Sequence, residues 1–229
     1  NVRPRQRPQH STPTTEYPVS HPSRVSAALI VGMLGSLVVM ALHPTGQDVV
    51  AIANAGGRDV MARAIHAFAI GLQPLLLAGY LGLALMLPNR DLAVFGVVTY
   101  AVGTSAVVGA ATLAGLVITP LLEASVSTTG VAQEIVLSQI RFAFAMNQAL
   151  TKVFVSLGGI AIACWSIAMR GDARFPATLR WLGITVAVIG VGGIAAGRLA
   201  LDVQGFGMIV LGQASWTCWA AVCVARTRA

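Results

Sequence analysis

Six long apolar runs, separated by short polar stretches, constrain the fold of this chain more than any other feature. They lie at about residues 25–42, 61–87, 92–119, 135–169, 182–197 and 206–225. A transmembrane helix needs about 20 predominantly apolar residues, and each run approaches or exceeds that length. Only 10% of the residues are charged, whereas about 25% are charged in a typical soluble domain. The sequence therefore predicts an all-α polytopic membrane protein, a bundle of about six transmembrane helices.

Two regions follow from this pattern. Residues 1–24 are rich in Pro, Arg, Ser and Thr and contain no apolar run, which is typical of a disordered basic tail. Residues 25–226 are then a six-helix transmembrane domain. The first run could also be a signal peptide cleaved after residues 51–53. It is longer than the usual apolar core of such a peptide, about 7–15 residues, and further spans follow, which favours a retained anchor.

The arginines predict the orientation of the bundle. With the N-terminus inside, ten arginines fall in inside segments and three in outside segments, while Arg141 and Lys152 lie on the fourth run. Cytoplasmic segments of membrane proteins carry such an excess. We therefore expect both termini in the cytoplasm and a bacterial-type inner membrane as the location. This rule also accounts for the net charge of +7, so nucleic-acid binding is not expected.

A polar stripe at helical spacing leads into the fourth run and includes Glu134, Arg141, Gln148 and Lys152. If the hydrocarbon core begins near Phe142, Lys152 lies about 14–15 Å deep, where a charge needs a partner or water. Gln73 has a similar predicted depth in the second run, so we expect Lys152 to point towards it and away from lipid. The alternative interpretation is a structural polar clamp between two helices.

These residues motivate the leading functional hypothesis, which is a membrane protein that handles a small solute or ion. The predicted site is an outward-facing polar cavity between the second and fourth spans, lined by Lys152, Gln148, Asn147, Gln73, His66 and Arg141. No nucleophile-elbow or nucleotide-binding pattern occurs, so an enzyme is the less favoured class.

Two histidines suggest a second hypothesis, a haem- or metal-binding membrane redox protein. His43 follows the first run and His66 begins the second, so their rings should converge at one end of adjacent helices. A ring separation above about 13 Å would exclude a shared haem or metal ion. The candidates for completing a metal site are acidic: Asp48, Glu123, Glu134 and Asp202. The three cysteines have no metal-binding spacing, and a structural disulfide is not expected.

Glycines carry a third hypothesis, a non-catalytic membrane subunit or assembly factor. Gly96, Gly103, Gly109 and Gly115 make the third run slim enough for close helix packing. Such Gly-rich faces could bind other membrane proteins. We expect Pro120 to end this run and residues 121–133 to form a loop, since proline interrupts helical hydrogen bonding.

Overall fold

The computed structural model describes residues 21–43, 59–199 and 201–226, and no strand occurs among them. It confirms the helical bundle: the described residues form six helical segments that are long and apolar enough to cross a membrane. The helices are α1 (Pro22–Leu42), α3 (Asp59–Met86), α4 (Arg90–Thr112), η1 (Leu113–Ile118, a π-helical segment), α5 (Thr119–Ser127), α6 (Gly130–Ala168), α7 (Ala177–Ala195) and α8 (Val203–Ala225). Residues 1–20 of the predicted tail, the cleavage site and Asp48 lie outside the described residues, whereas residues 22–24, predicted to belong to the tail, are the first turn of α1.

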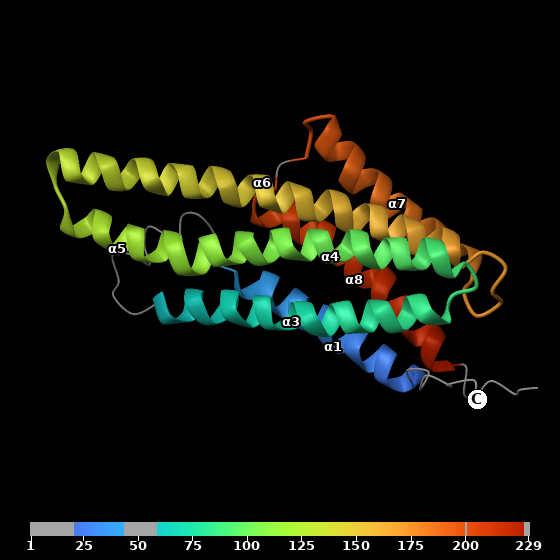
Figure 1. Cartoon of the computed structure of the whole chain (residues 1–229). Helices are drawn as coiled ribbons and strands as arrows, with labels where there is room; N and C mark the ends of the chain where they lie inside the picture. Colours follow the sequence, from blue (N-terminus) through green and yellow to red (C-terminus); the bar gives the residue numbers. More distant parts are fainter. Residues whose placement is uncertain (1–20, 44–58, 200, 227–229) are drawn as a thin grey trace, which may run out of the picture.

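Two long helical segments run side by side through the molecule (Figure 1). One is the continuous helix α4–η1–α5, and the other is α6, which returns antiparallel to it. Helix α3 packs on α4 and on α1, while α8 packs on α1 and α7, and α7 packs on α6. Figure 1 shows α4 lying between α3 and α6. This order keeps most of the second predicted span away from the fourth, although Tyr80 of α3 and Trp165 of α6 are in ring contact.

Aromatic side chains join four helices in the core. The rings of Tyr80 on α3 and Trp165 on α6 are stacked, with centroids 4.3 Å apart. Trp165 also stacks on Trp216 of α8 at 6.1 Å, and its indole Nε1 donates to the Ala93 carbonyl of α4 at 3.0 Å. The Tyr80 hydroxyl lies 2.7 Å from the Thr217 hydroxyl. In a membrane helix bundle such packing and interhelical hydrogen bonds hold the helices together, and the specific geometry of an aromatic pair contributes about 0.5–1.5 kcal/mol.

The predicted end of the third span at Pro120 is wrong. The helix passes through η1 and continues as α5 to Ser127, and α6 already begins at Gly130. Pro120 lies just after η1, and local π-helical adjustment re-satisfies the backbone groups that a proline frees in a membrane helix. The turn into α6 is correspondingly tight, and Gly130 adopts a φ of 63° there, a conformation that favours glycine.

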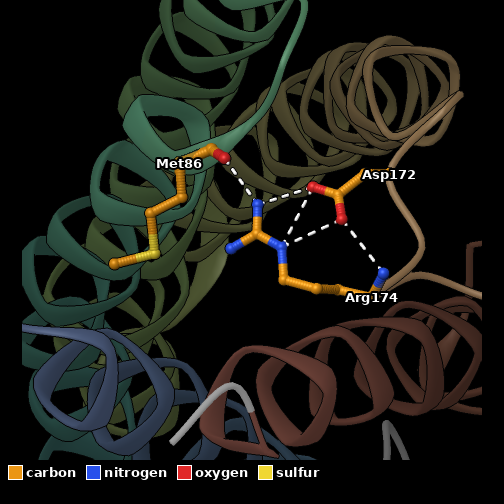
Figure 2. Close-up of polar contacts among 3 residues, drawn as sticks. All are labelled: Met86, Asp172 and Arg174. Atoms are coloured by element: carbon orange, nitrogen blue, oxygen red, sulfur yellow. Dashed lines mark hydrogen bonds and ion pairs between the residues drawn. The ribbon is translucent and has the colours of Figure 1, made fainter.

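An arginine in the connection between α6 and α7 fastens it to the end of α3 (Figure 2). Arg174 donates to the carbonyl of Met86 at 2.7 Å and to the Asp172 carboxylate at 3.0 Å. A cation suits this position because the carbonyls of a final helical turn lack intrahelical partners. The hydrogen bonds from Arg174 lower the pKa of Asp172, although partial burial opposes that shift.

Candidate functional site

The two histidines converge, as the sequence predicts. His43 is the residue that ends α1, and His66 lies in the second turn of α3. Their ring centroids are 5.1 Å apart, in an edge-to-face arrangement with an interplanar angle of 71°. This distance is far below the limit of about 13 Å beyond which one ion or one haem could not join both rings. The pair is therefore the strongest candidate site in the described part of the chain.

One nitrogen of His66 has a partner and the other does not. Nδ1 lies 2.7 Å from the carbonyl oxygen of Ala62, one turn earlier on the same helix. Because a carbonyl can only accept, Nδ1 carries the proton and the neutral ring keeps a lone pair on Nε2. Nε2 is buried and has no hydrogen-bond partner. A buried nitrogen lone pair without a partner is costly and is the usual donor of a metal-binding histidine.

The π-helical segment forms one wall of the site. Gly115 lies in the middle of η1, and a Cβ at this position would be 2.6 Å from the Cβ of His66 and 2.9 Å from its Cγ. Only glycine allows the two backbones to approach this closely. Single π-helical turns occur frequently at functional sites. Here the π turn brings the main chain of η1 directly against the base of the His66 side chain.

The ring geometry fits a bare ion better than haem. Two imidazoles on one tetrahedral ion, with metal–nitrogen distances near 2.0–2.1 Å, have centroids about 5 Å apart. Two axial imidazoles on a haem lie on opposite faces of the porphyrin, about 6 Å apart. The rings of His43 and His66 contact each other edge to face at 5.1 Å. This separation is close to the spacing for a bare ion and shorter than the spacing for two axial imidazoles of a haem, so the pair fits haem less well.

The acidic candidates do not join the histidines. Glu123 of α5 pairs with Arg63 of α3 at 3.6 Å, and Asp202 accepts a hydrogen bond from the backbone of Gly205 at 2.7 Å as the cap of α8. Glu134 is exposed on α6. Within residues 21–43, 59–199 and 201–226, no group of three His, Cys, Asp or Glu side chains could hold a metal ion. The histidine pair thus supplies two ligands.

The orientation predicted for Lys152 is wrong. Its side chain is exposed on α6, whereas Gln73 is buried on α3 and donates to the carbonyl of Ala69 in its own helix at 3.2 Å. The physical reason is the position of α4 between α3 and α6. The stripe on α6 does follow one helical face, but that face does not meet α3.

The other residues of the predicted cavity are separated as well. Asn147 donates to the carbonyl of Ala110 on α4 at 2.8 Å, and Gln148 donates to the carbonyl of Leu201, just before α8, at 3.1 Å. Arg141 is exposed. The two amides therefore join α6 to α4 and to the segment just before α8. This is the structural polar clamp of the alternative interpretation, but it joins other helices than the predicted second and fourth spans.

The glycine stripe of the third span contacts the chain's own helices. Cβ atoms placed at Gly96, Gly103 and Gly109 would lie close to side chains of α6, and one at Gly115 would meet α3. Close packing is confirmed in this sense. These four glycines are thus covered within the chain.

The contribution of Gly115 to the histidine site was missed by sequence reasoning. Its glycine spacing was recognised, but nothing in the spacing indicates that it touches His66. The neighbouring Pro120, read as a helix end, is the signal that could have pointed to irregular helix geometry.

Comparisons of the chain with protein-family models, with curated proteins and with solved structures give no match. The function is therefore argued from geometry.

Proposed function

We propose that this chain is a multi-pass membrane protein with both termini in the cytoplasm, and that it binds a transition-metal ion at its outer end through His43 and His66. The single observation that carries the proposal is the buried Nε2 of His66, which lacks a hydrogen-bond partner and belongs to a ring in contact with His43. The inside location of both termini follows from the arginine asymmetry. The same asymmetry puts the histidine end of α1 and α3 outside.

The surroundings of His66 support a ligand role. A metal-binding histidine almost always donates its other ring N–H to a carbonyl or carboxylate, which fixes the tautomer and the ring orientation. The Nδ1 contact to Ala62 does this. The main chain of η1 at Gly115 restricts movement of the His66 ring further, because it lies directly against the Cβ and Cγ atoms of His66. The ring is held with its second nitrogen available.

The number of ligands indicates what kind of binding is expected. Structural zinc sites are closed by four protein ligands, while sites with open positions bind water or a substrate as well. Two histidines leave at least two positions to water, a carbonyl or a solute. Imidazole suits zinc, copper, nickel and iron. The pair therefore suits an ion that binds reversibly. In this proposal His43 and His66 bind the ion, in place of Lys152 and the cavity predicted from the sequence.

Metal titration of the purified full chain in detergent tests this proposal. After removal of metals by a chelator, Zn²⁺, Cu²⁺ and Ni²⁺ are titrated by calorimetry, and thermal stability is recorded. We expect one ion per chain, and a stabilisation of about 2.7 kcal/mol when the free ion is 100 times its Kd. His43→Ala and His66→Ala should each weaken binding at least about tenfold, because each removes one of two ligands.

The control is His21→Ala. His21 lies at the other end of α1, where its ring contacts Ser23, so this variant should bind metal like the unmodified protein. Thermal denaturation of the metal-free variants checks that each is folded. If no ion stabilises the unmodified protein, or if His21→Ala weakens binding as much as His43→Ala, the proposal is wrong.

A further inference from the structure

A shallow depression lies at the opposite end of the bundle from the histidines. It has a volume of about 510 Å³ and is lined by Pro88, Asn89, Arg90, Asp91 and Arg170. The first four residues belong to the turn between α3 and α4 and to the first turn of α4, and Arg170 follows the end of α6. Two parts of the chain about 80 residues apart in sequence therefore form one open surface.

The charges of this surface favour an anion. Arg90 and Arg170 are exposed, and in the described part of the chain neither guanidinium takes part in an ion pair. The nearby Arg174 differs, because Asp172 and the Met86 carbonyl already occupy its guanidinium. Two guanidinium groups free to present several N–H donors are well suited to a phosphate group.

The start of α4 adds to the positive potential. Asn89 caps this helix of 23 residues by accepting a hydrogen bond from the backbone N–H of Leu92 at 3.2 Å. The other N–H groups of the first turn lack intrahelical partners, and the helix dipole is positive at this end. Asp91 has the opposite effect, because its carboxylate lines the same depression and repels an anion.

We propose that this depression binds a phosphate group, and that the group belongs to the headgroup of an anionic membrane lipid. The arginine asymmetry puts this end of the bundle at the cytoplasmic surface, where anionic headgroups meet basic pockets between transmembrane helices. The inference rests on that part of the proposed function and not on the metal site. Asp91 lowers the affinity, because its carboxylate repels the phosphate group.

The test measures binding to the purified full chain in detergent, with the chelator present so that the metal site does not contribute. Three probes are compared by thermal shift and by native mass spectrometry: phosphatidylglycerol, phosphatidylcholine and inorganic phosphate. We expect phosphatidylglycerol to bind and stabilise, and the zwitterionic lipid to do so much less. An equal response to inorganic phosphate would identify a free anion as the source and overturn the assignment to lipid.

Arginine and aspartate variants at the depression should change phosphatidylglycerol binding in opposite directions. Arg90→Gln and Arg170→Gln should each weaken phosphatidylglycerol binding about fivefold, because an arginine near an anionic membrane surface contributes about 1 kcal/mol. Asp91→Asn should strengthen it. The matched control is Arg226→Gln, which removes an exposed arginine at the same end of the bundle but outside the depression.

The results separate this inference from the proposed function. If Arg226→Gln weakens binding as much as Arg90→Gln, only the general positive charge matters and the site does not exist. The proposal is also wrong if Asp91→Asn does not strengthen phosphatidylglycerol binding. Zinc titration of Arg90→Gln should match the unmodified protein, and cysteine labelling at Asn89 from the cytoplasmic side tests the orientation independently.

Discussion

Replacement of Gly115 by alanine tests the contact between η1 and α3 on which the candidate site depends. The added Cβ would lie 2.6 Å from the Cβ of His66 and 2.9 Å from its Cγ. Real Cβ atoms essentially never approach other atoms below 3.0 Å, and here the neighbours are at the rigid base of the side chain. Either η1 or the start of α3 must therefore move.

The expected cost follows from overpacking. Adding a methyl group to a closely packed contact costs about 1–3 kcal/mol. Alanine also stabilises a helix relative to glycine by about 0.5–1 kcal/mol, which acts in the opposite direction. Gly71→Ala on α3 isolates the clash, because a Cβ at Gly71 has nothing within 4 Å and so gains only the helix-propensity term. Gly115→Ala should be about 1–3 kcal/mol less stable than Gly71→Ala.

Thermal denaturation of both variants in one detergent provides the comparison. A difference of 1 kcal/mol corresponds to about 2–4 °C in Tm for a chain of this size, so Gly115→Ala should melt roughly 2–12 °C below Gly71→Ala. Zinc binding should weaken in Gly115→Ala and not in Gly71→Ala. If Gly115→Ala melts at or above Gly71→Ala, the π-helical wall does not approach His66 and the reasoning about the site fails.

Two further substitutions test other parts of the structure. Asp172→Asn should cost about 1 kcal/mol near neutral pH, since it weakens a partly exposed ion pair with Arg174. The pKa of Asp172 is lowered in the folded protein, so the stabilisation from its ion pair is fully present above the unfolded pKa of about 3.9 and is lost as pH falls through the folded pKa. The Tm values of the unmodified protein and of Asp172→Asn should therefore converge in acid. A difference in Tm that stays constant with pH would contradict the assignment. Lys152→Met should change neither the free energy of zinc binding nor the free energy of unfolding by more than about 0.5 kcal/mol, as is usual at exposed positions, and a large loss of metal binding would restore Lys152 to the site.

The sequence was sufficient for the helices because apolar runs of membrane length have few alternative structures. It was also sufficient for the histidine pair. His43 caps the end of α1 and His66 lies in the second turn of α3, so the packing of α1 against α3 brings them to one level. The failure at Pro120 has a local cause. The proline rule applies to the interior of a regular α-helix, whereas Pro120 follows a π-helical segment and lies in the first turn of α5.

The site residues on α6 could not be predicted for a different reason. Helical spacing tells which residues share a face, as it does for the stripe from Glu134 to Lys152. It does not tell which neighbouring helix that face meets. In the bundle, α4 takes the place beside α6, and this order is a property of packing across the whole chain. The partner of Gly115 was hidden for the same reason.

The depth of Lys152 changes when it is counted from the arginine end of the bundle. An outer boundary near Phe142 is expected from the sequence, but α6 has 39 residues and is therefore about 58 Å long, well beyond a hydrocarbon core of about 30 Å. Arg170 follows Lys152 by 18 residues, or about 27 Å. With Arg170 at the inner boundary, Lys152 lies within reach of the outer one, where a lysine can extend its ammonium into water. Counted along α3 from Leu87, His66 lies at about 32 Å, so in the topology proposed above the histidine pair and Lys152 lie at a similar level near the outer boundary.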